Sequence, residues 1–438
     1  MNTYRIVPAI LSLLLPGLGQ LFNKQWIKGL IFAVIGTFSS LYFIKSLPHA
    51  VWGIVTLGEK TQRLVIGKDG ISEMVQGDHS ILLMLNGVFV VTFFALYVLF
   101  WFFNIKDAFI VGGLKEQNLK SPTFKQTLYF LSETKFPELM LIVPIIGVVF
   151  VTIVPIVFTV FIAFTNYSAP NYLPPAKLLD WVGFENFRRL VDFGEYKATF
   201  FGVARWTFIW AVLATVTTFF GGFLVALLVN QKDVKFKYFW RTMLILPFAV
   251  PQLVSLLVMR NLFNGEFGPI NQYLRSFGME NIPWLTDPLW AKATVVIVNM
   301  WLGIPVSMIF IMGILTMIPK DLYEAAEIDG ASKIKQFSKI TLPYVLFATA
   351  PIIIMQFAGN INNFNVIFLL TNGNPVNGDY MYAGDTDLLV TWLYKLTLDS
   401  QKYDVAGAVG IVIFIIIATL SLISYRNTSS FKEEDQIQ

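Results

Sequence analysis

Long apolar runs separated by short polar segments are the dominant pattern along this chain of 438 residues. A helix needs roughly 20 apolar residues to cross the hydrocarbon of a membrane. Eight runs reach or approach that length, and they predict membrane-spanning helices over 28–46, 80–104, 138–166, 203–230, 239–264, 289–318, 344–370 and 406–425. A ninth run, 6–22, is short and is broken by Pro16, Gly17 and Gly19, so a re-entrant or interfacial segment explains it at least as well as a span does.

Basic residues alternate between the segments that connect these runs. They are concentrated in 105–137, 231–238 and 320–343 and are sparse in 265–288 and 371–405. Because cytoplasmic loops carry an excess of Lys and Arg, the first three connections are predicted to be cytoplasmic and the last two external. The connection 167–202 is mildly basic and disagrees, but we place it outside with the majority. The predicted domains are an amino-terminal hydrophobic region with a basic cytoplasmic linker, a six-helix core and a cytoplasmic tail, over 1–137, 138–425 and 426–438.

Composition supports an all-α integral membrane protein with about eight transmembrane helices. Hydrophobic residues make up 55% and charged residues 14% of the chain, whereas soluble proteins carry about 25% charged residues. The absence of Cys excludes disulfides and thiol chemistry, and two isolated His residues do not suggest a metal pair. No G-x-x-x-x-G-K-[ST] phosphate loop occurs. We therefore expect no catalytic residue, no metal and no cofactor bound by this chain, and no nucleic-acid partner.

The predicted cytoplasmic segment between 321 and 343 has the pattern of a short helical hairpin. Asp321 and Glu324 have the spacing of a capping box, and Gly330 suits the left-handed position that ends a helix. Ser332 can cap a second short helix. The apolar residues Ile334, Phe337 and Ile340 recur every three positions, which predicts one buried stripe. On composition alone, an amphipathic hairpin resting on the membrane surface is the simpler interpretation.

This segment resembles the EAA loop of ABC-importer permeases. The resemblance rests on Glu324-Ala325-Ala326, Gly330 and Ile340-Thr341-Leu342-Pro343 at the spacing of that motif. It implies that the loop is a coupling helix that docks on a separate cytoplasmic ATPase, with Glu324 in a charged contact. The ATPase-coupling residues implied are Glu324, Ala325, Ala326, Asp329 and Gly330.

Further stretches extend the resemblance over about 138–425. They are Phe164–Ser168, Val182–Phe187, Leu246–Pro251, Trp301–Pro305, Asn362–Phe364, Leu370–Gly373 and Thr386–Val390. Together they are similar to the larger, MalF-like permease of maltose/maltodextrin importers. Some members of that family carry a large domain in the first external loop of the core, but 167–202 is too short to contain one. Forms without that domain resemble those of Gram-positive bacteria, in which the sugar-binding protein is usually lipid-anchored.

A polar stripe on the predicted span 344–370 marks the candidate sugar site. Gln356, Asn360 and Asn363 fall on one face near its middle, where amides are costly unless they pair or line a cavity. Interhelical hydrogen bonding accounts for them equally well from chemistry alone. The resemblance implies that Asn360 and Asn363 hold sugar, that Phe248 replaces a stacking Tyr, and that Gly303 offers a backbone contact. Val306 stands where a second Tyr is expected and Gln356 replaces a smaller polar residue, so the identity of the sugar stays open.

The resemblance also implies the rest of the assembly. We expect a second permease in a heterodimer, two copies of an ATPase that uses ATP and Mg²⁺, an extracellular sugar-binding protein and membrane lipid. The location implied is a bacterial cell membrane, and the missing insert favours a Gram-positive one. The alternative is an ion-coupled secondary sugar carrier, which favours intramembrane acidic residues and repeated halves. Neither is visible, because the charged residues in the spans, Arg205, Arg260 and Lys292, lie near their ends.

Overall fold

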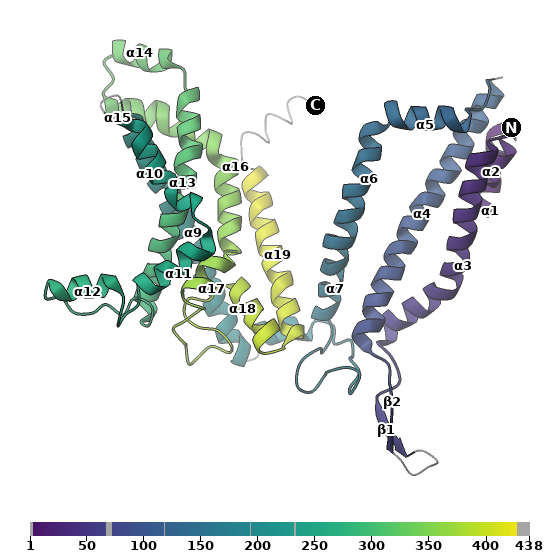
Figure 1. The fold of residues 1–438 in the computed structure, drawn as a ribbon, viewed down its shortest axis with the longest axis horizontal. Helices are drawn as coiled ribbons and strands as arrows, with labels where there is room; N and C mark the ends of the chain where they lie inside the picture. The colour runs from purple at the N-terminus through teal and green to yellow at the C-terminus, as the bar shows by residue number, and fades with distance from the viewer. Residues whose placement is uncertain (1–2, 67–71, 118, 193, 232–233, 427–438) are drawn as a thin grey trace. The chain divides into compact units, whose positions relative to one another are not determined.

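The computed structural model describes residues 3–66, 72–117, 119–192, 194–231 and 234–426, and they are mostly helical (Figure 1). Within these residues, seven helices are long and apolar enough to cross a membrane. An eighth span results if two shorter helices, bent by 92° at their junction, are counted as one. The prediction of an all-α membrane protein with about eight spans is confirmed.

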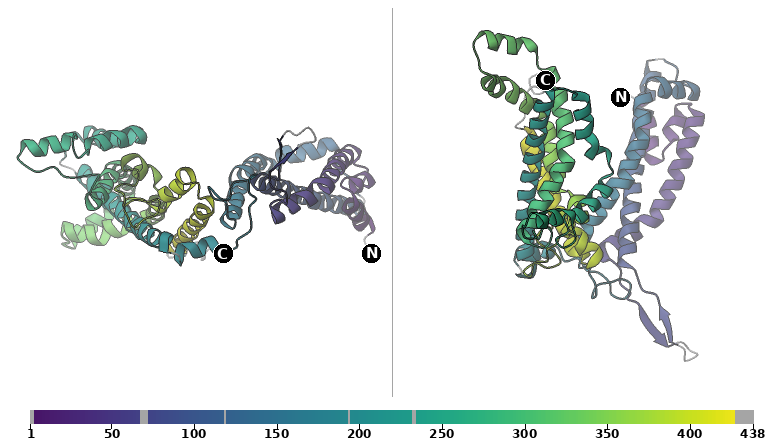
Figure 2. Two further views of the ribbon diagram at one scale, coloured as in Figure 1. Left: turned by 90° about the horizontal axis from the view of Figure 1, so that it is seen from below. Right: turned by 60° about the vertical axis from the view of Figure 1, so that its left-hand side comes forward.

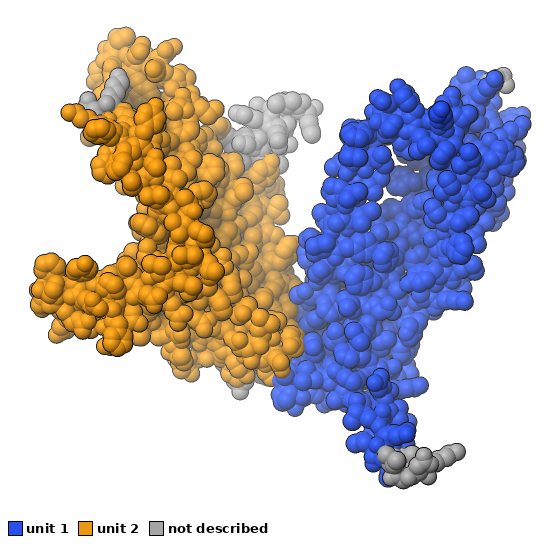
Figure 3. Space-filling view, viewed as in Figure 1, with its two compact units in different colours: residues 1–183 blue, residues 184–438 orange. Residues whose placement is uncertain are grey.

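The chain divides into two compact units, Met1–Gly183 and Phe184–Gln438 (Figure 3). The elements of unit 1 are α1 (Thr3–Leu14), α2 (Leu18–Phe22), α3 (Trp26–Thr56), β1 (Arg63–Ile66), β2 (Ser72–Val75), α4 (Ser80–Glu116), α5 (Phe124–Glu133), α6 (Phe136–Val148), the π-helical turn η1 (Val149–Ile153) and α7 (Val154–Ala163).

In unit 1 the broken apolar run at the amino terminus forms two short helices rather than a span. The chain turns between α1 and α2 at Gly17, whose φ is 93°. A β-carbon on Gly17 would lie 2.3 Å from the carbonyl oxygen of Gly29 in α3, so only glycine fits this close approach. Polar side chains then tie the turn to α4: Gln20 Nε2 donates to Asp107 Oδ2 at 2.9 Å, and Lys28 pairs with Asp107 at 2.6 Å.

A two-stranded antiparallel hairpin, β1–β2, interrupts the helices of unit 1. Its register pairs Leu64 with Met74 and Ile66 with Ser72, and every residue of both strands is exposed. The hairpin extends beyond the helix ends of its own unit (Figures 1 and 2). The sequence pattern did not predict it, because its strands are four residues long and carry no packed face.

Unit 2 holds the rest of the helices. Its elements are α8 (Glu185–Val191), α9 (Gly194–Asn230), α10 (Lys237–Ala249), α11 (Gln252–Leu262), α12 (Pro269–Ser276), α13 (Pro288–Met317), α14 (Lys320–Ile328), α15 (Lys333–Gln336), η2 (Phe337–Thr341), α16 (Leu342–Ile361), α17 (Phe364–Leu370), α18 (Leu389–Tyr394), η3 (Lys395–Asp399) and α19 (Tyr403–Arg426). The most extensive packing in this unit is between the long helices α9 and α13.

Two of the predicted spans differ from continuous helices. The run 239–264 is divided between α10 and α11 at Pro251, which has no N–H to continue the helix and occupies the N-cap position of α11. The run 344–370 is also wrong as a single span, because α16 ends at Ile361 and α17 starts at Phe364. Asn363 caps α17 by accepting a hydrogen bond from Val366 N, so its side chain holds the new helix start rather than the middle of a helix.

Candidate functional site: an amide cluster, two cavities and a helical hairpin

The two candidate asparagines lie together where α16 meets α9 and α13. Asn360 Nδ2 donates to Thr215 Oγ1 at 3.0 Å. Asn363 Nδ2 lies 3.4 Å from Asn360 Oδ1 and 3.3 Å from Asn299 Oδ1. Asn360, Asn299 and Thr215 are buried, and Asn363 is half-buried. Side chains from three helices and a helix cap therefore form one polar cluster within apolar packing.

Gln356 and Gly303 both lie against Thr218 of α9, and Gln356 is one turn before Asn360 along α16. Gln356 Nε2 donates to Thr218 Oγ1 at 2.8 Å, and Thr218 in turn donates to Ala214 O. Gly303 on α13 faces this hydroxyl-bearing side chain: a β-carbon there would lie 2.5 Å from Thr218 Cγ2. The close packing of α9 on α13 thus depends on the missing side chain at Gly303.

The candidate stacking residue Phe248 lies in a different place from the amides. It is 61% exposed and lines a cavity of about 380 Å³ at the bend between α10 and α11, with Leu302 from α13. Gln252, also in this cavity, accepts a hydrogen bond from Asn365 Nδ2 at 3.0 Å. The structure brings Gln356, Asn360, Asn363 and Gly303 to one interface, whereas Phe248 lines a neighbouring hollow.

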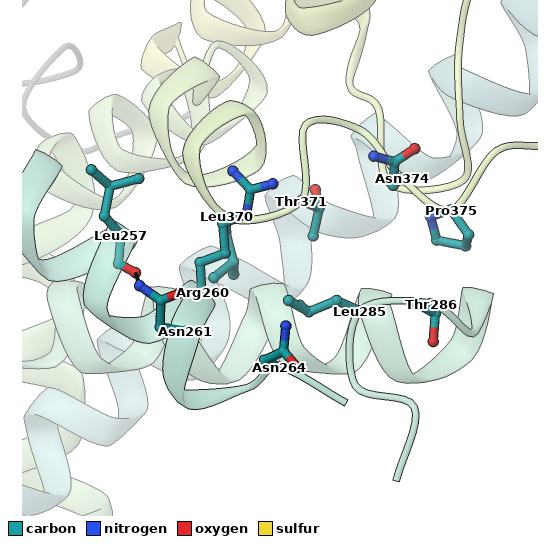
Figure 4. Close-up of a pocket in the computed structure, with 10 residues that line it drawn as sticks. All are labelled: Leu257, Arg260, Asn261, Asn264, Leu285, Thr286, Leu370, Thr371, Asn374 and Pro375. Carbon is teal, nitrogen blue, oxygen red and sulfur yellow. Dashed lines mark hydrogen bonds between the residues drawn. The ribbon is translucent and has the colours of Figure 1, made fainter. Parts of the chain in front are cut away.

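A larger cavity of about 660 Å³ opens where α11 and α17 end, on the side assigned as external (Figure 4). Arg260, Asn261 and Asn264 reach it from the end of α11, and Thr371 and Asn374 from the loop after α17. Apolar surface beside these polar groups comes from Leu257, Leu285, Leu370 and Pro375. The volume and mixed lining are those of ordinary small-molecule sites. The sequence singled out Arg260 only as a charge near a span end, because its cavity is built from segments distant along the chain.

The loop before α18, which is predicted to be external, is organised by a buried carboxylate that the sequence did not identify. Asp387 is fully buried and accepts hydrogen bonds from Gly384 N, Thr391 Oγ1 and Lys395 Nζ, each at 2.7 Å. Burial raises the pKa of Asp387, and the nearby Lys395 ammonium acts in the opposite direction. The stretch Thr386–Val390 carries part of the family resemblance, but nothing local in it reveals that the carboxylate pairs eight residues further on.

At the end predicted to be cytoplasmic, the loop after α13 is the predicted helical hairpin. Gly330 has φ 73°, Gly330 N donates to Glu327 O at 3.0 Å and Ala331 N donates to Ala326 O at 2.9 Å. These two bonds are the Schellman motif expected for a left-handed glycine at a helix end. Ser332 Oγ accepts from Lys335 N, as predicted for the cap of the second helix.

Two details of this hairpin were predicted wrongly. Pro319, not Asp321, is the N-cap residue of α14, and no side-chain cap bond forms, so the capping box between Asp321 and Glu324 is absent. Ile334 is 79% exposed and does not join a buried stripe. The π-helical turn η2 alters the periodicity after Gln336, and Gln336 is buried instead.

The hairpin is tied to the helices that carry the amide cluster. Tyr323 Oη on α14 lies 2.8 Å from Thr341 Oγ1, directly before α16. The ring of Phe337 packs on Phe223 of α9 with centroids 5.6 Å apart. By contrast, most of the candidate coupling residues are open to solvent. The exposed ones are Glu324, Ala325, Asp329 and Gly330, and Ala326 is half-buried. The face of α14 that bears these residues is therefore open, while its base is attached to α16.

Comparison with known proteins identifies the family. Residues 218–430 match the family model described as "Binding-protein-dependent transport system inner membrane component". The chain is 40% identical to the galactooligosaccharides transport system permease protein GanP of Bacillus subtilis, over 97% of this chain and 98% of GanP. It is 37% identical to the maltodextrin transport system permease protein MalC of Streptococcus pneumoniae, over 98% of this chain and 97% of MalC.

Two further matches concern the core and the fold. The maltose/maltodextrin permease MalF of Vibrio cholerae is 42% identical over 56% of this chain but only 48% of its own length. A chain from the crystal structure of a bacterial alginate ABC transporter, in complex with alginate pentasaccharide-bound periplasmic protein, aligns with a TM-score of 0.56. At 22% identity, covering 68% of this chain and 94% of that one, it shows a shared fold. The chain belongs to the family of binding-protein-dependent transport system inner membrane components, as a permease subunit of the ABC sugar-importer type.

Proposed function

We propose that this chain lines the path by which an oligosaccharide of the maltodextrin or galactooligosaccharide type is imported. The observation that carries the proposal is the cluster of uncharged amides and hydroxyls shared by α9, α13, α16 and the cap of α17. Sugar hydroxyls both donate and accept hydrogen bonds, and amides offer both without the cost of a buried charge. In the described structure these groups bond to one another, so sugar binding exchanges those bonds for bonds to the substrate.

The external cavity gives the substrate a route to that cluster. Helix α17 starts at the cap residue Asn363 and ends at Leu370, which lines the cavity. Seven helical residues span about 10 Å, which places the cavity and the cluster at the two ends of one short helix. In this cavity, the apolar side chains suit the apolar face of a sugar ring, and the amides and the guanidinium suit its hydroxyl groups. Phe248 offers an exposed aromatic ring at the α10–α11 bend.

Helix α14 is proposed as the contact with the ATPase. Beside Glu324 it exposes apolar side chains, Ile328 at 87% and Leu322 at 46%. Apolar groups without cover around a charge are typical of a protein interface. A push on α14 reaches α16 through Tyr323 and Thr341, and α16 carries Asn360 in its last turn. Rigid-body movement of such a helix pair is an established way to couple distant sites.

The remaining parts of the machinery lie on other chains. As a permease of an ABC sugar importer, this chain is a transport subunit that works with a partner permease, a separate ATPase and a substrate-binding protein. We place ATP and Mg²⁺ on two copies of the ATPase, and we propose a lipid-anchored binding protein on a Gram-positive cell membrane. Support comes from the similarity to GanP of Bacillus subtilis and MalC of Streptococcus pneumoniae over 97% and 98% of this chain, whereas the match to MalF covers only 48% of that protein. The ion-coupled carrier has no such support.

The test is sugar-dependent ATPase activity of the reconstituted complex. The substrates are maltose, maltotriose, longer dextrins, raffinose and a galactooligosaccharide, each presented by the cognate binding protein. Stimulation by one oligosaccharide series is expected, and the series that stimulates identifies the substrate. Stimulation by an amino acid and by no carbohydrate would overturn the proposal.

A further inference from the structure

Helix α5 in unit 1 has the character of a helix lying on the cytoplasmic surface of the membrane. It connects α4 to α6, both candidate spans, and runs across their ends (Figure 1). None of its residues is buried, and it exposes Leu128, Tyr129 and Phe130. An amphipathic helix placed between two spans with apolar groups uncovered is positioned at the headgroup level of the lipid.

A cavity of about 210 Å³ lies at the amino-terminal end of this helix. Its walls are residues 24–28, which lead into α3, and residues 121–124 with Thr127, which lead into α5. Gln25 Nε2 donates to Pro122 O at 3.0 Å and joins the two walls. The cavity therefore sits where one span begins and the interfacial helix begins, at the membrane boundary.

Positive charge converges on the cavity. Lys24 and Lys28 line it; Lys28 is held by Asp107 at 2.6 Å, and Lys24 is exposed. Thr123 caps α5 by accepting from Gln126 N, so the positive end of the helix dipole faces the same space. Because Asp107 neutralises Lys28, it is the Lys24 ammonium together with the helix terminus that attracts a phosphate.

Two buried polar atoms in these walls favour a ligand that carries more than a phosphate. Among the described residues, Gln25 Oε1 and Ser121 Oγ are buried and make no hydrogen bond, and Gln25 is only 7% exposed. A buried acceptor without a donor costs about 1–3 kcal/mol. Because the other end of the Gln25 amide is fixed to Pro122, its oxygen needs a hydrogen-bond donor, which a ligand hydroxyl can supply and an ionised phosphate oxygen cannot. The site thus calls for a group that carries both a phosphate and a hydroxyl.

We infer that this cavity binds the glycerophosphate headgroup of an anionic phospholipid from the cytoplasmic leaflet. The lipid's phosphate lies between Lys24 and the start of α5, and a glycerol hydroxyl donates to Gln25 and contacts Ser121. Trp26, 67% exposed beside the cavity, belongs at the lipid interface. Basic pockets between helices at the cytoplasmic surface are the usual form of such lipid sites.

The experiment measures lipid binding to the full permease complex by native mass spectrometry. Phosphatidylglycerol, phosphatidic acid and phosphatidylcholine of equal chain length are titrated, with sn-glycerol 3-phosphate and inorganic phosphate as soluble probes. Lys24 has φ 60°, so Lys24→Asn is chosen because Asn tolerates left-handed backbone. Lys120→Asn is the matched control, because Lys120 is an exposed lysine in the segment between α4 and α5 and does not line the cavity.

Phosphatidylglycerol is expected to bind in preference to both other lipids. Lys24→Asn should weaken the binding of phosphatidylglycerol about fivefold. Ser121→Ala should remove the preference for phosphatidylglycerol over phosphatidic acid. Lys120→Asn should change neither the affinity nor the preference. Equal binding of phosphatidylcholine, or equal losses in Lys24→Asn and Lys120→Asn, overturns the site. If the soluble phosphates saturate the cavity at matched concentration, the bound phosphate group does not come from a lipid. If no probe binds, the site itself is overturned.

Discussion

Gly373 lies directly against the buried carboxylate of Asp387. A β-carbon on Gly373 would be 2.2 Å from Asp387 Oδ1, and Gly373 has φ 78°. The glycine thus allows the external loop to fold over Asp387, which in turn is held by Gly384, Thr391 and Lys395. This loop also contributes Thr371 and Asn374 to the external cavity, so its shape determines part of the cavity wall.

Replacing Gly373 by Ala should disrupt the loop. The left-handed backbone and the contact with Asp387 together are expected to cost about 1–3 kcal/mol. The loss is measured by thermal unfolding of the purified complex and by the rate of proteolysis within 371–388. Gly378→Ala in the same loop is the control, because a β-carbon there meets nothing within 4 Å. Equal behaviour of the two variants would contradict this account of Gly373.

The Asp387–Lys395 pair predicts a specific pH dependence. Burial raises the pKa of Asp387 above its usual value near 3.8. A carboxyl with a raised pKa binds its proton more tightly in the folded protein, so its contribution to stability is greatest below the unfolded pKa and falls as the pH rises through the folded pKa. Lys395 counteracts the shift, so Lys395→Met should raise the pKa further and enlarge this loss at neutral pH.

We therefore expect Lys395→Met to destabilise the complex more at pH 8 than at pH 5. Removing one partner of a buried ion pair costs about 3–5 kcal/mol of stability when the remaining carboxylate is ionised. The melting temperature is recorded against pH for the wild type, for Lys395→Met and for a double variant that also carries Asp387→Asn. The double variant has no charge at either position and should lose the pH dependence. A constant difference between the wild type and Lys395→Met across pH 5–8 would show that the pair does not titrate in this way.

The amide cluster allows sugar binding to be separated from helix packing. Thr215→Val removes the acceptor of Asn360 without changing the side-chain shape, and it should cost about 1 kcal/mol of stability while transport continues. Asn360→Leu removes the amide itself and should lower sugar-stimulated ATPase activity about tenfold or more, as expected for one or two hydrogen bonds lost to substrate. Both variants are compared by melting temperature and by ATPase activity against sugar concentration. If Thr215→Val abolishes activity as fully as Asn360→Leu, packing explains the cluster.

A structural feature could be predicted from the sequence where residues close to it in the chain determine it. Gly330 and Ser332 were placed correctly at the ends of short helices because caps are set by a few neighbouring residues. The break after Ile361 was missed, since hydropathy continues through α17 while the backbone stops for a cap at Asn363. Two other features could not be predicted, because they arise from tertiary contacts that leave no periodic pattern in the sequence. They are the contacts of Asp387 with Gly373 and Lys395, and the cavity around Arg260. The roles of Asn360, Asn363 and Glu324 stay predictions.

Gly303 should be required for the contact between α9 and α13. Gly303→Ala places a β-carbon 2.5 Å from Thr218 Cγ2, so either the helices separate or Thr218 turns away from Gln356. We expect this overpacking to reduce transport and to lower the free energy of unfolding by about 1–3 kcal/mol. Gly313→Ala on the same helix is the control, because a β-carbon at that position would meet nothing within 4 Å outside the backbone of its own helix in the described structure. Adding Thr218→Ser, which deletes the obstructing methyl and keeps the hydroxyl, should restore transport, and failure of this rescue would place the defect elsewhere.

Two variants of the α14 hairpin distinguish its fold from its docking. Gly330 has positive φ and open space around it, so Gly330→Asn should be tolerated and Gly330→Val should not, because a β-branched residue is strained there. Glu324→Lys leaves the exposed helix intact but reverses the charge offered to the ATPase, so it should abolish co-purification of the ATPase while membrane insertion is kept. Glu327→Lys is the comparison on the same helix, since Glu327 already pairs with Lys333. Retained assembly and transport in Glu324→Lys would mean that the ATPase docks on another part of the chain.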